Sequence, residues 1–274
     1  MKLTHTFTTA LALIFFAGQF SSPILAAEPL SAQELSAEQK GLAIATKAYE
    51  IDKGWGDSSS TMQMILRKKK GQERTREMRS RSIEIDGDGD RGIIIFDDPA
   101  DVKGTAMLTH SHKVESDDQW LFLPDLKRVK RISSSNKSGA FMSSEFAYED
   151  MGSQEVEKYT YRFIRDENID GRDYFVIERK PVDRKSGYTK QITWIDQETY
   201  RMHRVEFYDR KSALLKTLNA SEYKLYLDKY WRPGRMDMQN HITGKSTTLL
   251  FKDYQFANGF EEKDFTKTSL KKAK

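Results

Sequence analysis

Alternation of apolar and polar residues over many short segments is the feature that most limits the fold of this chain. Thr61–Leu66 alternates in this way, and the charged turn Lys68–Gly71 separates it from a second strand-like segment that ends at Ile85. Successive side chains of a strand point to opposite faces of a sheet, so a period of two indicates half-buried strands. The pattern predicts a mainly β fold.

Strand-like segments recur at regular spacing to the end of the chain. Turn sequences such as Asp170-Gly171-Arg172 and Thr243-Gly244-Lys245 separate them. About eleven strands at this spacing are typical of an antiparallel sandwich or barrel. No linker rich in Pro or Ser divides them, so we expect a single domain over residues 28–274.

Residues 1–27 have the layout of a secretory signal peptide. Lys2 precedes the apolar block Ala10–Ala17, and Ala26 and Ala27 precede the first acidic residue, Glu28. The block is shorter than the ~20 residues of a membrane-spanning helix, which argues against the alternative of a retained anchor. The chain has no cysteine, hence no disulfide and no thiol for lipid attachment. We therefore expect a soluble protein of the periplasm.

One helix is expected before the first strand. Ser31-Ala32-Gln33-Glu34 fits the capping box, in which a Ser and a Glu three residues later satisfy each other's backbone N–H groups. Apolar residues at approximately helical spacing continue to Ile51, and Gly54 and Gly56 end the helix.

The charge balance excludes a nucleic-acid-binding protein of the usual kind. Charged residues make up 31% of the chain, but 45 basic and 41 acidic residues leave a net charge of only +4. Such a surface is mixed and solvated and lacks a concentrated basic field.

Each sequence that resembles a motif for a metal, a cofactor or catalysis is better explained as an ordinary turn or strand. Asp86–Asp90 lacks the Gly and Glu of a calcium loop and is better explained as a tight turn. His110 and His112 could share a face, but a metal would need a third ligand. Gly244-Lys245-Ser246 lacks the first glycine of a phosphate loop, and no G-x-S-x-G sequence occurs. We expect no metal, no cofactor and no enzymatic activity.

Aromatic alternation on neighbouring strands is the strongest local signal. Methionines in several strands, Met64 among them, add soft, adaptable apolar surface. Most of these residues would fill an ordinary core, which is the alternative. A barrel of about eight strands is just filled by side chains, however, and a wider sheet leaves room for a ligand. The residues expected to line or border an apolar cavity are Met64, Trp120, Phe122, Tyr159, Tyr161, Phe163, Phe175, Ile177 and Trp194.

The segment Lys127–Met151 interrupts the strand pattern. It is polar, rich in Ser and carries Phe141, Phe146 and Tyr148, which predicts a long loop with short helical pieces across one end of the sheet. We expect it to act as a lid. The cations at its start predict a docking site for acidic protein or lipid headgroups, with a solvated hairpin tip as the alternative. These cations are Lys127, Arg128, Lys130 and Arg131.

Four segments resemble the outer-membrane lipoprotein-sorting proteins of the lipoprotein-carrier (LolA/LolB-like) superfamily. They are Phe96–Ala106 (FDDPADVKGTA), Asp118–Pro124 (DQWLFLP), Lys130–Ser134 (KRISS) and Ser144–Asp150 (SEFAYED). The resemblance runs from the first helix to the C-terminal strands.

The resemblance implies an incomplete antiparallel β-barrel around an apolar cavity, with helices as a lid. It further implies a periplasmic carrier that moves a lipid or the acyl chains of a lipoprotein between the inner and outer membranes. The implied partners are that passenger, an inner-membrane exporter of the resistance-nodulation-division (RND) type and, transiently, the membrane surface. The lid-locking arginine of the studied carriers has no matching position in the sequence.

Two other functions remain open at this point. One is an accessory subunit that binds the exporter and carries nothing. The other is a hydrolase that acts on a lipid in the cavity. Lipid extracted from the purified protein would favour the carrier, and turnover of that lipid would favour the hydrolase.

Overall fold

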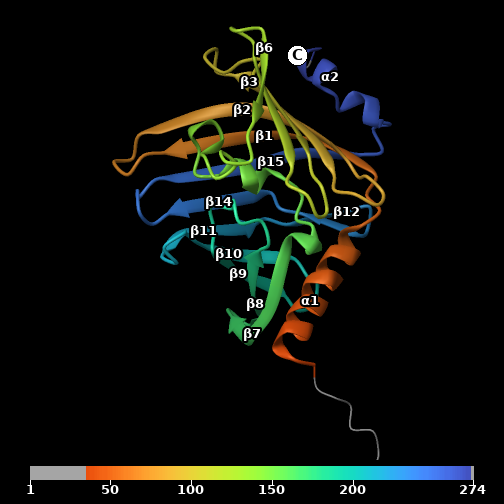
Figure 1. The fold of residues 1–274 in the computed structure, drawn as a ribbon, viewed down its shortest axis with the longest axis vertical. Helices are drawn as coiled ribbons and strands as arrows, with labels where there is room; N and C mark the ends of the chain where they lie inside the picture. The colour runs from red at the N-terminus through yellow and green to blue at the C-terminus, as the bar shows by residue number, and fades with distance from the viewer. Residues whose placement is uncertain (1–34, 273–274) are drawn as a thin grey trace, which may run out of the picture. The chain divides into compact units, whose positions relative to one another are not determined.

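The computed structural model describes residues 35–272, and most of them belong to one antiparallel sheet of 13 strands (Figure 1). A separate two-stranded hairpin, β12–β13, accompanies the sheet. The strands are β1 (Asp57–Arg67), β2 (Glu73–Ile83), β3 (Arg91–Asp98), β4 (Ala106–His110), β5 (Asp118–Leu123), β6 (Arg128–Ile132), β7 (Tyr159–Ile169), β8 (Arg172–Pro181), β9 (Lys190–Asp196), β10 (Met202–Tyr208), β11 (Leu214–Ser221), β12 (Lys224–Tyr226), β13 (Tyr230–Arg232), β14 (Arg235–Asn240) and β15 (Ser246–Phe256).

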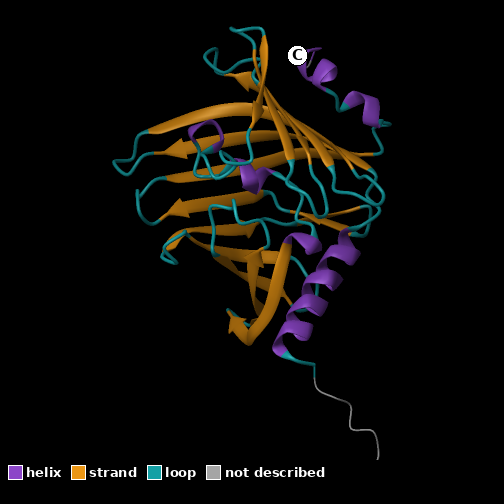
Figure 2. Cartoon of the chain, in the orientation of Figure 1, coloured by secondary structure: helices purple, strands orange, loops and turns teal. Residues whose placement is uncertain are grey.

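The helices are few and short apart from the first. Figure 2 shows them against the sheet. They are the α-helices α1 (Ala37–Asp52) and α2 (Lys267–Lys272), and the 3₁₀ helices η1 (Phe141–Ser143), η2 (Tyr148–Met151), η3 (Val156–Lys158) and η4 (Glu262–Asp264). In the described part of the chain, none of them has the length and apolar character that crossing a membrane requires.

The strand order leaves the barrel open. Across the sheet it is β6-β5-β4-β3-β2-β1-β15-β14-β11-β10-β9-β8-β7, so β6 and β7 are the two edges and do not pair with each other. These edge strands are consecutive in sequence, and residues 133–158 connect them across the inner face (Figure 1). The predicted incomplete antiparallel barrel is confirmed.

The strand count differs from the predicted number in two places. The segment Lys127–Met151 is not a loop throughout, because residues 128–132 form the edge strand β6. Turns also divide residues 214–232 into the three strands β11, β12 and β13, with Leu227 and Asp228 in left-handed backbone conformations before β13.

The first helix begins later than its predicted cap. Ser36 is the N-cap: its hydroxyl accepts the Gln39 N–H at 3.2 Å, and the Gln39 side chain accepts the Ser36 N–H at 2.9 Å. This is the capping box in its Ser/Gln form. The predicted box Ser31–Glu34 lies outside the described residues, as does the signal peptide at 1–27. The single-domain prediction for 28–274 remains a prediction, although residues 35–272 lie within one compact unit.

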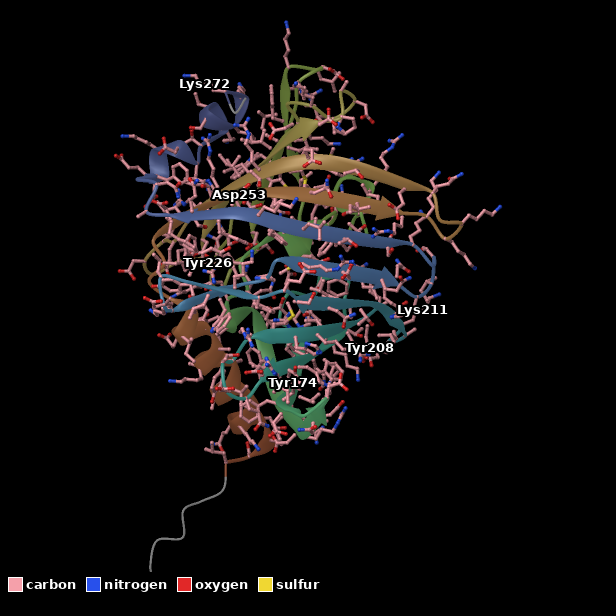
Figure 3. All side chains as sticks on the ribbon, turned by 180° about the vertical axis from the view of Figure 1, so that it is seen from behind. Tyr174, Tyr208, Lys211, Tyr226, Asp253 and Lys272 are labelled. Carbon is pink, nitrogen blue, oxygen red and sulfur yellow. The ribbon has the colours of Figure 1, made fainter. Side chains whose placement is uncertain are left out.

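Both faces of the sheet bury apolar side chains. The inner face, toward α1 and residues 133–158, holds the larger cluster, whose members include Met62, Met64, Met78, Phe96, Met107, Leu121, Val205, Phe207, Leu218, Met238 and Leu249. The outer face of β3–β5 is covered by Phe265, which follows η4, and by Leu270 of α2. A second outer cluster spans β8–β10 and includes Tyr174 and Tyr208, which Figure 3 labels.

Candidate ligand-binding cavity

A cavity of about 1000 Å³ lies on the inner face of the sheet. Strand register explains its apolar wall, since Met62 pairs with Phe251, Met236 with Leu249 and Val205 with Leu218, and paired side chains share a face. The apolar side chains that line it are Met62, Met107, Phe146, Met151, Val205, Phe207, Leu218, Met236, Met238, Leu249 and Phe251. Methionine side chains adapt to ligands of varied shape.

Helix α1 forms one wall of the cavity. Ala45, Ala48 and Tyr49 line it from the helix. The helix packs very closely on β7, because a Cβ added to Gly41 would lie 2.6 Å from the backbone nitrogen of Phe163. Glycine at this position therefore sets the distance between helix and sheet.

One end of the cavity is strongly acidic. Asp52, Glu84, Asp90 and Glu155 line it together. The Glu155 carboxylate is buried and accepts hydrogen bonds from the Tyr49 hydroxyl at 2.8 Å and the Ser153 hydroxyl at 2.7 Å. Burial, followed by the charges of Glu155 and Glu84, raises the pKa of Asp90 to about 7. Burial likewise raises the pKa of Asp52, which pairs with Arg232 at 2.6 Å.

Residues 141–151 pack against the inner face and contribute Phe146, Glu149, Asp150 and Met151 to the cavity lining. Phe141 is fully buried, with its ring centroid 5.9 Å from that of Phe96 and 5.8 Å from that of Tyr148. Phe146 joins the same cluster and also lines the cavity. The aromatic residues of the predicted lid thus form part of the core.

Buried polar side chains of the sheet hold this segment. Lys216 of β11 donates to the Asp150 carboxylate at 2.7 Å and to the Glu145 carbonyl at 2.9 Å, and Tyr188 donates to Asp150 at 2.9 Å. Arg76 of β2 donates to the carbonyl of Met142, which has a left-handed backbone conformation. The structure therefore anchors the predicted loop to strands from both halves of the sheet.

Comparison with known proteins identifies the family. A family model described as an uncharacterized protein matches residues 88–272. A crystal structure described as an outer membrane lipoprotein-sorting protein domain from Vibrio parahaemolyticus is 58% identical, with a TM-score of 0.84; the match covers 85% of this chain and 99% of that one. The chain belongs to the outer-membrane lipoprotein-sorting protein family. This confirms the resemblance found in the sequence.

Two further structures share the fold of this lipoprotein-sorting family member. A DUF1329 family protein from Desulfovibrio piger is 29% identical, with a TM-score of 0.82 and coverage of 86% of this chain and 100% of that one. A LolA superfamily protein from Nitrosomonas europaea is 24% identical, with a TM-score of 0.67 and coverage of 86% and 99%, which shows the LolA-like fold. Comparison with curated proteins gives no match.

Six of the nine predicted cavity residues of this family member lie on the inner face, in two groups. Tyr159, Tyr161 and Ile177 line the cavity. Met64 is fully buried in the inner cluster beside it, and Phe163 and Phe175 pack in the cluster that contains Ile44 and Ala45 of α1.

The structure corrects the placement of three predicted residues. Trp120 and Phe122 lie on the outer face of β5, where they pack in the cluster that includes Phe265 and Leu270 near the C-terminus. Trp194 lies on the outer face of β9, and the guanidinium of Arg204 sits 4.8 Å from its ring. Alternation groups residues on one face but does not tell which face turns inward.

The four predicted docking cations lie along the edge of the sheet. Lys127 is in the turn before β6 and has a left-handed backbone conformation, and Arg128, Lys130 and Arg131 are exposed on β6. Arg131 forms an ion pair with Asp118. Cations on an unpaired edge strand also prevent pairing with a strand of another molecule.

The histidines are engaged separately. His110 Nε2 lies 2.7 Å from the Phe265 carbonyl oxygen, and His112 Nδ1 lies 2.9 Å from the Asp88 carboxylate. Asp86–Asp90 belongs to the connection between β2 and β3. Among residues 35–272, no group of three His, Cys, Asp or Glu side chains is placed to hold a metal ion.

The buried charged side chains in and beside the cavity were not predicted from the sequence. Arg76, Lys216 and Glu155 occupy strand or loop positions that resemble solvated surface in the sequence, yet each is at most 5% exposed. Of the three, only Glu155 lines the cavity. For Arg76 and Lys216, the period-two alternation of their strands was the sequence signal that could have indicated burial. In the register of β1 with β2, Arg76 pairs with Met64 and therefore shares its inner face.

Proposed function

We propose that this lipoprotein-sorting family member is a periplasmic carrier that shelters a lipid or lipoprotein acyl chains in its cavity and moves them between the inner and outer membranes. The observation that carries the proposal is the apolar cavity of about 1000 Å³. Exposing an acyl chain to water costs ~0.8 kcal/mol per methylene, or roughly 12 kcal/mol for about 15 methylenes. A wall of methionine, aromatic and aliphatic side chains offsets that cost.

The size of the cavity supports an acyl ligand. Ligand-binding pockets commonly measure roughly 300–1,000 Å³, so this cavity is at the upper end of the range. Shelter and release need no bond to be made or broken, and we therefore propose a carrier without enzymatic activity. A relative described as a lipoprotein-sorting protein also supports the proposal of a carrier.

Docking is proposed for the cationic edge of the sheet. Lys127, Arg128 and Lys130 are exposed and form no ion pair among residues 35–272. We propose that they and Arg131 meet acidic groups of an RND-type exporter or of the membrane surface during loading or release. Signal cleavage near residue 27 would deliver the chain to the periplasm, where such a surface is accessible.

Lipid content of the exported protein tests the proposal. The protein is purified from the periplasmic fraction, extracted with organic solvent and analysed by mass spectrometry, with Ala48→Trp and Ala43→Trp as matched variants. Ala48 lines the cavity from α1, whereas Ala43 is exposed on the same helix. We expect bound phospholipid or acylated peptide in the parent and in Ala43→Trp, and a several-fold loss in Ala48→Trp, because the indole fills the cavity.

The other functions are outcomes of the same experiment. Extracts free of lipid from a parent that still binds the exporter would establish an accessory subunit instead of a carrier. Conversion of the bound lipid on incubation would establish a hydrolase.

A further inference from the structure

Three polar residues interrupt the apolar wall of the cavity on β8 and β9. Arg179, Gln191 and Thr193 all line the cavity. Arg179 pairs with Gln191 across the two strands, and Thr193 pairs with Ile177 one position deeper on the same face. Residues in this diagonal relation lie roughly 7–8 Å apart, which a long arginine side chain can bridge.

The guanidinium of Arg179 has no acidic partner. Its Nε donates to the Gln191 side-chain oxygen at 2.6 Å, and its plane lies 4.7 Å from the Tyr159 ring centroid. Within residues 35–272, no carboxylate oxygen lies within 4.0 Å of its nitrogens. Cation–π contact and one hydrogen bond orient the group but leave the donors at its two Nη atoms unused.

Two acidic residues that line the same cavity, Glu149 and Asp150, have other partners. Asp150 accepts hydrogen bonds from Lys216 and Tyr188. Glu149 accepts from the Ser186 hydroxyl at 2.6 Å and the Gly187 N–H at 2.8 Å. Neither carboxylate neutralises Arg179 through direct contact.

A second group in the same patch also lacks a partner. The Thr193 hydroxyl is buried, in a residue only 3% exposed, and forms no hydrogen bond with any group of the described residues 35–272. A buried hydroxyl without a partner costs free energy, which a ligand acceptor would recover. The oxygen of the Gln191 amide accepts from Arg179, so this residue presents its NH₂ group, which also interacts with the Tyr159 hydroxyl, as its donor.

We propose that Arg179, Gln191 and Thr193 form a site for the anionic headgroup of an amphiphile, a carboxylate or a phosphate. The set offers donors and a positive charge, which anionic oxygens match and a neutral headgroup does not. The acyl chain would extend along the apolar wall formed by residues such as Val205, Phe207 and Met238. The inference rests on the proposed function, because it assumes that the cavity holds lipid.

Affinities for three ligands of equal chain length test the site. Delipidated, folded protein of the full exported chain is titrated with palmitate, hexadecyl phosphate and 1-hexadecanol in competition with a fluorescent fatty acid. We expect at least one of the two anions to bind 10-fold or more tighter than the alcohol. Whichever anion binds more tightly identifies the headgroup class.

Arg179→Gln and Lys180→Gln form the matched pair of variants. Lys180 follows on the same strand, points to the opposite face and is exposed. Removing a hydrogen-bonded charge typically lowers affinity by about 10- to 100-fold. We expect that loss for the anions in Arg179→Gln with the alcohol unaffected, and parental values for all ligands in Lys180→Gln.

Thr193→Val tests the same site independently, so the proposal can be tested even if Arg179→Gln fails to fold. It removes a buried hydroxyl without a partner at nearly constant volume, so we expect higher thermal stability of the ligand-free protein and several-fold weaker anion binding. Equal affinity of the parent for anions and alcohol, or anion binding unchanged in Arg179→Gln and Thr193→Val, would overturn the inference while leaving the carrier proposal intact. No binding of any of the three ligands would overturn both.

Discussion

At the scale of single residues, Asp90, which lines the cavity, makes the stability of the folded protein depend on pH. Its pKa is raised to about 7, mainly by burial and then by Glu155 and Glu84. In the unfolded chain the same carboxyl titrates near 3.9. Between these values the folded state holds a proton that the unfolded state releases, so the contribution of Asp90 to stability is lost as the pH rises from about 4 to 7.

Asp90→Asn should remove this dependence. We expect the variant to be more stable than the parent at pH 8 by roughly 1–2 kcal/mol, less than the full pKa shift would give because the carboxyl is partly exposed. At pH 4 the two proteins should have nearly equal free energies of unfolding. Urea denaturation at both pH values measures this. A constant difference between parent and variant across the range would contradict the assignment.

At the scale of elements, Gly41 controls how α1 meets the sheet. Replacing glycine inside a helix by alanine usually stabilises by up to about 1 kcal/mol. Here the new Cβ would lie 2.6 Å from the Phe163 nitrogen, so the helix must move away from β7. We expect Gly41→Ala to lower the free energy of unfolding by about 1–3 kcal/mol, as overpacking does.

Thr46→Ala is the control for that substitution, because Thr46 is exposed on the same helix. Thermal unfolding of the two variants should change in opposite directions, with Thr46→Ala unchanged or slightly more stable. Stabilisation by Gly41→Ala would mean that the contact between helix and strand is looser than the structure has it.

The segment between β6 and β7 depends on a buried ion pair. The side chains of Lys216 and Asp150 are 4% and 8% exposed. Removing one member of a buried pair leaves an uncompensated charge and typically costs 3–5 kcal/mol. We expect a loss of about that size in Lys216→Met by urea denaturation. Lys211→Met, at the exposed turn after β10 (Figure 3), should stay within about 0.5 kcal/mol of the parent. An equal loss in both variants would exclude a special role for the pair.

At the scale of the whole molecule, the cationic edge is expected to govern association and not folding. Each exposed cation near an anionic surface contributes roughly 1 kcal/mol, so four together matter where one does not. Changing Lys127, Arg128, Lys130 and Arg131 to Glu should leave the melting temperature nearly unchanged, apart from the lost contact of Arg131 with Asp118. Binding to vesicles containing anionic lipid, or to the exporter, should weaken and lose its salt dependence. Parental binding at low salt would identify the edge as solvated surface that only blocks strand pairing.

The type of fold and the grouping of residues by face could be predicted from the amino-acid sequence. Period-two alternation predicted an antiparallel β protein, and the segments around Phe96–Ala106 and Ser144–Asp150 indicated the family that the comparisons establish. Alternation also placed Tyr159 and Tyr161 together on one face, because side-chain direction along a strand is a local property of the backbone.

Which face of the sheet lines the cavity, and which charged side chains are buried, depends on long-range contacts that a local sequence pattern does not contain. Trp120 and Phe122 are covered by α2, from more than a hundred residues further along the chain, so no local pattern marks their face as the outer one. Arg179 and Lys216 face inward because their strands pair in a particular register with distant partners. Burial depends on which segments meet in space. A lysine in a strand can therefore be solvated or, like Lys216, buried in an ion pair with Asp150, and the local sequence does not distinguish the two.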